Sequence, residues 1–195
     1  MAHAVLLGDP EFFRVQAGNN PHARDRWGRR KKVNLPQAIA QWNCLKETLE
    51  SHGGKGYVLP AQHSQPGLGF PANAGFRYEN CFYLSNLNPS RFGEREHYRT
   101  FLSSLPLAVR DLATSLPFEG EADFFPVGDP SGDLKKTVYL FTWGKISRQR
   151  WVGRIGVPPY RRVYGFRSDG QMLNVLQSIV KGHEIVPLEL TDESH

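Results

Sequence analysis

Three carboxylates fall within five residues of one short segment. Glu119, Glu121 and Asp123 belong to the sequence FEGEAD, which contains a glycine and leads into an apolar stretch that begins at Phe124. Carboxylates at the start of a strand can orient a histidine, act as a base or bind a cationic substrate. They can also be exposed residues of a turn, and composition by itself favours that simpler interpretation.

Two further segments could bind parts of a small molecule. Arg167 in GFRSD precedes a predicted helix start, where a guanidinium and free backbone amides can converge on a carboxylate. Asn73 in PANAG can donate and accept hydrogen bonds, and its small neighbours let a ligand approach the backbone. An arginine bonded to a neighbouring loop explains GFRSD equally well, and PANAG is a weak signal by itself.

An alternation of helices and strands must position these residues. Apolar residues at helical spacing predict one helix over Pro36–His52, capped by Asn34, and another over Arg91–Leu105. A third helix is expected to be capped by Ser168 or Asp169 and to end before Gly182. Each helix returns to a strand within a few residues, which indicates an α/β chain built from similar modules. The predicted strands are Tyr57–Leu59, Cys81–Leu87, Val138–Trp143 and Ile185–Leu190.

The length and composition of the chain predict a single domain. It has 195 residues, of which 39% are hydrophobic and 22% charged, an ordinary balance for a packed globular protein. The sequence contains no apolar run of membrane-spanning length and no signal-peptide core, so we expect a cytoplasmic protein without a membrane partner. No His or Cys pair has metal-ligand spacing, so neither a metal nor another cofactor is expected.

A basic segment raises the question of nucleic acid. Six of the nine residues in RDRWGRRKK, positions 24–32, are basic, and the formal net charge is +5. Trp27 is the single aromatic residue in this run, and the sequence contains no recognisable nucleic-acid-binding motif. We therefore interpret the segment as a solvated connection and do not expect a nucleic-acid partner.

Taken in order, several short motifs resemble the guanidino-group-modifying superfamily. They are NNPH at 19–22, QW at 41–42, FPANAG at 70–75, SRFGERE at 90–96, FEGEAD at 118–123, GFRSD at 165–169 and LELTD at 188–192. The superfamily contains dimethylarginine dimethylaminohydrolases, arginine deiminases, arginine dihydrolases and glycine amidinotransferases. The resemblance implies an α/β fold, the α/β-propeller called pentein, in which five ββαβ modules surround a central pore. Residues 1–195 would then form an incomplete N-terminal portion with about three of the five modules.

The resemblance also implies roles for particular residues. Glu119 matches the catalytic acid that orients a histidine, with Glu121 and Asp123 as alternatives. Asn73 matches the position that faces the guanidinium, and its being Asn is similar to the arginine dihydrolases. Arg167, and less closely Arg95, match arginines that bind the substrate α-carboxylate.

The chain departs from the superfamily pattern at two places. Gly67 stands where an aspartate usually follows the proline of the preceding loop, and the motifs that carry the catalytic histidine and cysteine would fall beyond His195. Cys44 and Cys81 are interpreted as small buried hydrophobic residues instead of nucleophiles. We therefore expect an amidine hydrolase or amidinotransferase relative that is inactive alone, for which arginine or methylarginine is the ligand and self-association is possible. The alternative is a noncatalytic binding or interaction module on the same scaffold.

Overall fold

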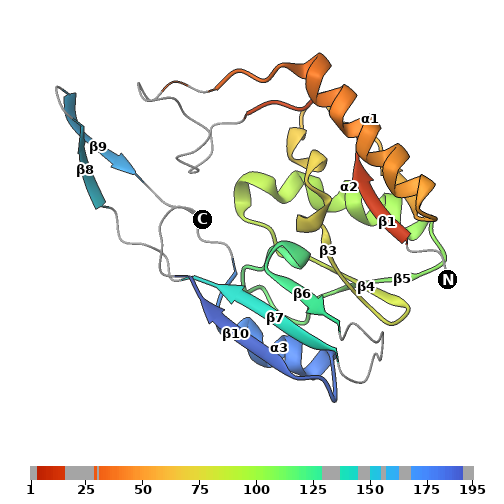
Figure 1. The fold of residues 1–195 in the computed structure, drawn as a ribbon. Helices are drawn as coiled ribbons and strands as arrows, with labels where there is room; N and C mark the ends of the chain where they lie inside the picture. Colours follow the sequence, from red (N-terminus) through yellow and green to blue (C-terminus); the bar gives the residue numbers. More distant parts are fainter. Residues whose placement is uncertain are drawn as a thin grey trace.

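The computed structural model contains three small sheets, each with a helix, that follow one another along the chain, and a separate two-stranded hairpin (Figure 1). It describes residues 4–15, 29, 31–128, 137–144, 150–154, 157–162 and 168–190, with only the backbone described in 150–154 and 157–162. The segments NNPH and 24–28, together with Arg167 and His195, lie outside these residues.

The first unit is a helix between two parallel strands. Strand β1 (Ala4–Gly8) pairs with β2 (Lys55–Leu59), and α1 (Leu35–Ser51) connects them. As predicted, Asn34 caps α1, because its side-chain oxygen accepts a hydrogen bond from the backbone N–H of Gln37.

The second and third units share one ββαβ order. In the second, β4 (Cys81–Leu84) lies between an antiparallel partner, β3 (Gly75–Tyr78), and a parallel partner, β5 (Ala108–Asp111), and α2 (Phe92–Ser103) precedes β5. The third unit repeats this arrangement around a central strand, with an inserted hairpin before its helix. Its elements are β6 (Phe124–Val127), β7 (Val138–Trp143), β8 (Arg150–Arg154), β9 (Val157–Arg162), α3 (Met172–Ile179) and β10 (Ile185–Glu189).

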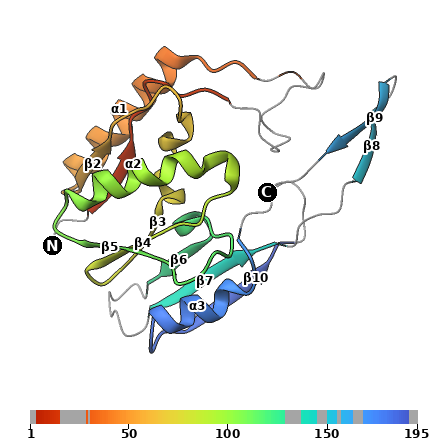
Figure 2. The same cartoon turned by 180° about the vertical axis from the view of Figure 1, so that it is seen from behind.

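The sequence therefore correctly predicts an α/β chain made of similar modules. All three helices and the main strands form where the periodicity places them. The view from behind shows α2 above the strands of the second unit and α3 beside β10 of the third (Figure 2). The β8–β9 hairpin was not expected. The segment that contains Gly67 and PANAG forms two 3₁₀ turns, η2 (Pro66–Gly69) and η3 (Pro71–Asn73).

Two of the expectations for side chains need correction. Ser168 does not cap the third helix, because its hydroxyl is bonded to Asp123. The other candidate, Asp169, accepts a hydrogen bond at 2.8 Å from the backbone N–H of Gln171, the residue that precedes α3. The two cysteines are not buried as expected: Cys44 is exposed and Cys81 is half-buried, because α1 buries no residue completely and Cys81 is the first residue of β4, next to the β3–β4 turn.

Two hydrophobic clusters hold the units together. One lies between the first two units and includes Leu59, Leu84 and Tyr98; the other lies between the second and third units and is centred on aromatic rings. The Phe76 and Phe124 rings, from different sheets, meet edge to face with centroids 4.9 Å apart. Packing in the two clusters therefore restricts the movement of the chain segments that lie between them.

No helix within the described ranges is long and apolar enough to cross a membrane. The described part of the chain also contains no group of three or more His, Cys, Asp or Glu residues that could hold a metal ion.

Candidate functional site

Asn73 and Glu119, which are 46 residues apart in sequence, meet between the two hydrophobic clusters. The Asn73 side-chain amide donates to Glu119 Oε2 at 2.9 Å. Asn73 is the last residue of η3 and is 8% exposed, and the side chain of Glu119 is 12% exposed. The structure therefore brings together the residues predicted to be the catalytic acid and the guanidinium-facing amide.

Backbone contacts determine where Glu119 lies. The preceding residue, Phe118, is fully buried and its backbone N–H bonds to the Asn86 carbonyl, while the Glu119 N–H donates to Ser168 Oγ at 3.1 Å. The following residue, Gly120, has a φ of +63°, and a Cβ there would lie 2.5 Å from the Gly75 carbonyl oxygen. Glycine is therefore required for this turn to pack against β3.

The three carboxylates of FEGEAD occupy three different environments. Glu119 faces Asn73, whereas Glu121 accepts a long hydrogen bond from the Arg77 N–H at 3.4 Å. Asp123 is fully buried; its carboxylate accepts from Ser168 Oγ at 2.7 Å and from Thr142 Oγ1 at 3.1 Å. Glu119 is thus the one of the three that lies against Asn73, and Asp123 holds the segment before β6 against Thr142 of β7 and against Ser168.

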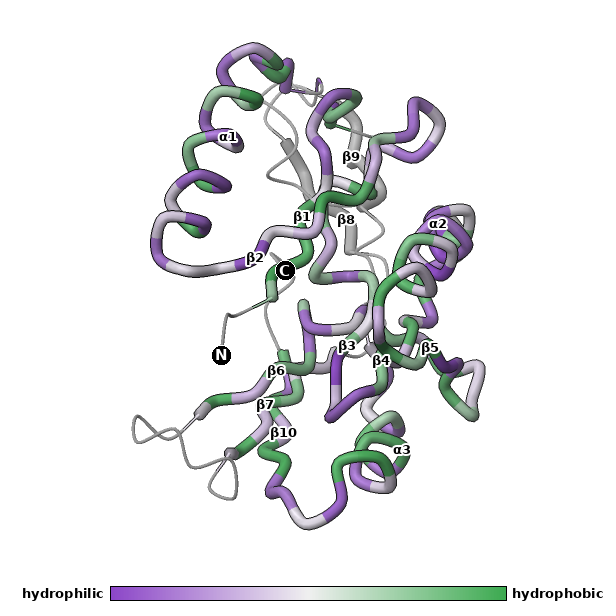
Figure 3. The backbone as a smooth tube through the Cα atoms, turned by 90° about the vertical axis from the view of Figure 1, so that its right-hand side faces the viewer, coloured by the Kyte–Doolittle hydropathy of each residue, from purple (hydrophilic) through white to green (hydrophobic). Residues whose placement is uncertain are grey.

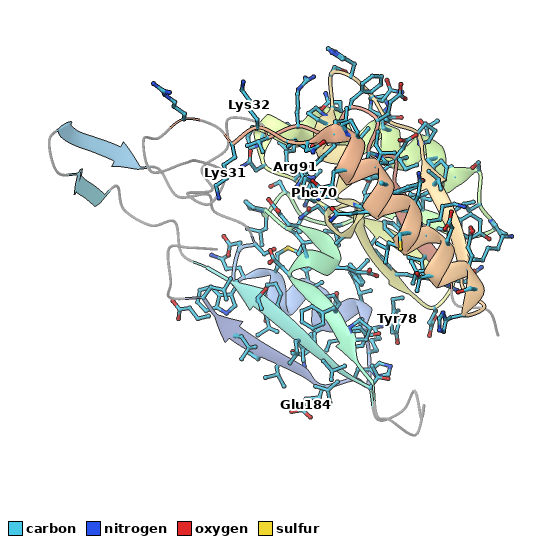
Figure 4. The ribbon with its side chains drawn as sticks, turned by 45° about the horizontal axis from the view of Figure 1, so that its top comes forward. Lys31, Lys32, Phe70, Tyr78, Arg91 and Glu184 are labelled. Atoms are coloured by element: carbon cyan, nitrogen blue, oxygen red, sulfur yellow. The ribbon has the colours of Figure 1, made fainter. Side chains whose placement is uncertain are left out.

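Arg91 also lies in this group, although the sequence analysis did not select it. Its guanidinium binds both Glu94 oxygens, at 2.8 and 2.6 Å, and donates to the Gly67 carbonyl at 3.2 Å. Arg91 Nη1 lies 3.9 Å from Glu119 Oε2. Figure 4 shows Arg91 within the body of the protein near Phe70, whereas Lys31 and Lys32 of the basic segment extend away from it. The signal for Arg91 was its spacing of three residues from Glu94 in SRFGERE, which suits an ion pair on one helical turn.

Glu94 occupies the space beside Gly67. It is 1% exposed, and a Cβ on Gly67 would lie 2.0 Å from Glu94 Oε1. A buried carboxylate therefore already fills the region where the superfamily pattern has an aspartate side chain, and Arg91 neutralises it.

The sequence offered two arginines for a substrate carboxylate, and the structure describes one of them, Arg95. Arg95 binds the Asp111 carboxylate and the Ser85 carbonyl, so it connects α2 to the end of β5. Arg167 lies outside the described residues, although the next residue, Ser168, contacts the Glu119 backbone. The predicted binding of a substrate carboxylate by these two arginines stays a prediction.

Solved structures share this fold over nearly the whole chain. The chain is similar to the substrate-bound N-terminal domain of ArgZ, an arginine dihydrolase from the ornithine–ammonia cycle in cyanobacteria, with a TM-score of 0.71, 23% identity, and 97% of this chain and 59% of that chain covered. A mutant of AgrE in binary complex with L-arginine matches with a TM-score of 0.74 and 23% identity over 98% of this chain and 24% of that one. A dimethylarginine dimethylaminohydrolase adduct with S-methyl-L-thiocitrulline matches with a TM-score of 0.61 and 18% identity over 97% of this chain and 62% of that one.

These likenesses confirm the predicted fold, a partial pentein propeller. The chain spans about 59% of the length of the ArgZ domain. No protein-family model matches the sequence. No curated protein matches it either.

Proposed function

We propose that this chain supplies the guanidinium-binding part of an enzyme site that modifies the guanidino group of arginine or a methylarginine. The hydrogen bond between Asn73 and Glu119 carries the proposal, because an amide oxygen and a carboxylate at one point suit a planar cation. The fold shared with ArgZ, described as an arginine dihydrolase bound to substrate, supports the same substrate class.

In this proposal the reaction needs groups from outside the 195 residues. A cysteine thiolate attacks the central guanidinium carbon, a histidine protonates the departing amine, and water or another amine releases the product from the covalent intermediate. Glu119 accepts a hydrogen bond from the bound guanidinium, orients the histidine and stabilises its protonated form, and Asn73 positions the guanidinium. Arg167 and Arg95 are proposed to bind the substrate α-carboxylate. To do so, the Arg95 guanidinium would have to break its ion pair with Asp111.

Chemical-shift titration of the purified, ¹⁵N-labelled chain tests the binding step. We expect L-arginine and agmatine to shift the Asn73 side-chain amide and the Gly120 amide, whereas uncharged L-citrulline should shift neither. Glu119→Gln should weaken this response by roughly 10- to 150-fold, because a charge-assisted hydrogen bond contributes about 1.5–3 kcal/mol. Glu121→Gln is the matched control and should retain it.

Two results would contradict the proposed site. One is an equal response to arginine and citrulline; the other is an arginine response that survives Glu119→Gln but not Glu121→Gln. The chain alone should release no ammonia, citrulline or ornithine from arginine, because Cys44 lies on an exposed helix and Cys81 at the β3–β4 turn. Arginine binding that persists without turnover after the missing modules are supplied would favour the noncatalytic alternative.

A further inference from the structure

Asn73 lies at the end of two short turns that need support from other parts of the chain. The turns η2 and η3 contain four and three residues, and 3₁₀ turns of this length make few hydrogen bonds of their own. Phe70 lies between them: its N–H donates to the Gly67 carbonyl at 3.0 Å, and its carbonyl accepts from the Asn73 N–H at 3.1 Å. The position of the Phe70 carbonyl therefore helps to determine where Asn73 lies.

The ring of Phe70 does little to hold this carbonyl in place. Phe70 is 51% exposed, and its ring meets that of Phe13 edge to face with centroids 5.5 Å apart. An exposed ring gains little from burial, so it restrains its own backbone weakly. The restraint comes from α2 instead, because the Tyr98 hydroxyl donates to the Phe70 carbonyl oxygen at 3.4 Å.

Helix α2 contacts the segment of the two turns at two main-chain carbonyls. Arg91, the residue before the helix, donates to the Gly67 carbonyl of η2 at 3.2 Å, and Tyr98 donates to the Phe70 carbonyl that follows η2. Arg91 and Tyr98 are about two helical turns apart, so their side chains lie along one side of α2. The segment from η2 to η3 is thus held from this side of the helix.

The Tyr98 hydroxyl requires a hydrogen-bond acceptor. Tyr98 is fully buried. Burial, to which the Glu94 charge adds, raises the pKa of the Tyr98 hydroxyl far above its ordinary value, and Arg91 opposes only part of this shift. The hydroxyl therefore keeps its proton, and a buried donor without an acceptor is costly. Among the hydrogen bonds of the described residues, the Phe70 carbonyl is the acceptor for this proton.

We propose that Tyr98 is a positioning residue for the candidate site: its hydroxyl fixes the Phe70 carbonyl, and this carbonyl in turn fixes Asn73 against Glu119. The Asn73 amide donates to Glu119 Oε2 at 2.9 Å, so a movement of η3 by about 0.5 Å would take that hydrogen bond out of its usual range. Tyr98 acts through Phe70 and needs no contact with a ligand. The consequence for arginine binding rests on the proposed function, whereas the consequence for the Asn73–Glu119 hydrogen bond does not.

Tyr98→Phe tests the proposal in the ligand-free chain, because it removes the hydroxyl and keeps the buried ring. Solvent exchange of the Asn73 side-chain amide, followed by ¹⁵N NMR, reports on its hydrogen bond to Glu119. We expect the exchange to accelerate by about 2- to 12-fold, the factor that corresponds to the net contribution of one neutral hydrogen bond, about 0.5–1.5 kcal/mol. Glu119→Gln shows the response of the same amide when the charged acceptor is lost.

Tyr83→Phe is the matched control. It also removes one tyrosine hydroxyl, but that hydroxyl lies beside Cys81 and Arg110, so exchange of the Asn73 amide should not change. If Tyr98→Phe does not fold, the parent chain provides the test. The Tyr98 hydroxyl proton should then be detected as a slowly exchanging resonance, as expected for a buried donor with an acceptor.

Ligand binding distinguishes positioning from a general loss of stability. Tyr98→Phe should weaken the binding of L-arginine and of agmatine equally, by about 2- to 12-fold, because the two ligands share the guanidinium that Asn73 would face. In an Asn73→Ala background the same substitution should leave binding unchanged, since the residue through which Tyr98 acts is gone. An equal loss of affinity in both backgrounds would show a merely structural role and overturn the proposal.

Three further results would overturn it. They are unchanged exchange of the Asn73 amide in folded Tyr98→Phe, equal acceleration by Tyr98→Phe and Tyr83→Phe, and a rapidly exchanging Tyr98 hydroxyl proton in the parent chain. A chain that binds no arginine contradicts only the proposed function, because the exchange measurements still decide the role of Tyr98.

Discussion

At the scale of single residues, the contact between Ser168 and Asp123 determines how the candidate site is held. Both side chains are fully buried, and the Ser168 hydroxyl accepts from the Glu119 backbone while it donates to the Asp123 carboxylate. A hydroxyl can do both at once, and neither alanine nor valine can. The position of Glu119 therefore depends on a residue of the third unit.

Ser168→Ala should lower the free energy of unfolding by about 1–3 kcal/mol, because it removes a donor to a buried carboxylate and an acceptor for a backbone N–H. Chemical denaturation monitored by fluorescence measures the change. Ser178→Ala is the control, since its exposed hydroxyl bonds only to a carbonyl of its own helix, and it should change stability by less than about 0.5 kcal/mol. Equal effects of the two substitutions would show that the Ser168 contact is not formed.

At the scale of elements, α2 is attached to its surroundings through charged side chains at two points. Near its beginning, Arg91 and the buried Glu94 lie against Gly67 of η2. Further along, Arg95 and Arg99 both bind Asp111, the last residue of β5. The first contact is buried and the second is exposed, so their contributions to stability should differ in size.

Gly67→Ala tests the buried contact. Its Cβ would lie 2.0 Å from Glu94 Oε1, so the carboxylate must move away from Arg91, and we expect a loss of about 1–3 kcal/mol in the free energy of unfolding. A Cβ at Gly128 would meet nothing within 4 Å, and Gly128→Ala should be neutral or slightly stabilising. Comparable stabilities for the two variants, measured by urea denaturation, would contradict the close packing of η2 against α2.

Asp111→Asn tests the exposed contact through its pH dependence. The hydrogen bond from Arg99 and the nearby positive charges outweigh partial desolvation and lower the pKa of the Asp111 carboxyl group in the folded state. Its stabilising contribution is therefore present above its unfolded pKa of about 3.9 and is lost as the pH falls through the lowered folded value. We expect Asp111→Asn to be less stable than the parent by up to about 1 kcal/mol near pH 7, and the difference to vanish below about pH 3.

The same comparison in an Arg95→Gln, Arg99→Gln background is the control. The pH-dependent difference should disappear there, because both cations that face Asp111 are gone. Denaturation series at several pH values measure it, and a difference that persists in this background would assign the effect to other groups.

At the scale of the whole molecule, the helix of the first unit is less completely buried than the helices of the other two units. No residue of α1 is fully buried, and Leu45 on its apolar side is 51% exposed. Figure 3 shows apolar and polar residues alternating along α1, which stands at one side of the molecule. Apolar surface of this kind favours association with another protein surface.

We therefore expect the purified chain to self-associate with rising concentration, as measured by sedimentation velocity. Leu45→Glu should reduce the association, because it places a charge on the apolar side of α1. Asn43→Glu adds the same charge at another exposed position of α1 and should leave the association unchanged. A chain that remains monomeric at all concentrations, with a cooperative transition at high temperature, would contradict this expectation.

Local patterns in the sequence were sufficient for the secondary structure and the fold class. The spacing of apolar residues in α1, α2 and α3 and the cap at Asn34 act within a few residues, so they can be read without knowledge of distant contacts. The ordered motifs gave the propeller fold, which the solved structures confirm. They also selected Asn73 and, with Glu121 and Asp123 as alternatives, Glu119 as candidate site residues, and the structure shows a hydrogen bond between Asn73 and Glu119.

Only the tertiary structure decided the role of residues whose partners are distant in sequence. Ser168 bonds to Asp123 across 45 residues instead of capping α3, Arg95 pairs with Asp111, and Arg91 lies beside Glu119. Such choices depend on which polar group reaches a partner when water is excluded, and burial makes an unpaired polar group costly. The sequence by itself therefore determined the modules and the candidate pair, and the packing of one module on the next decided which charges surround that pair.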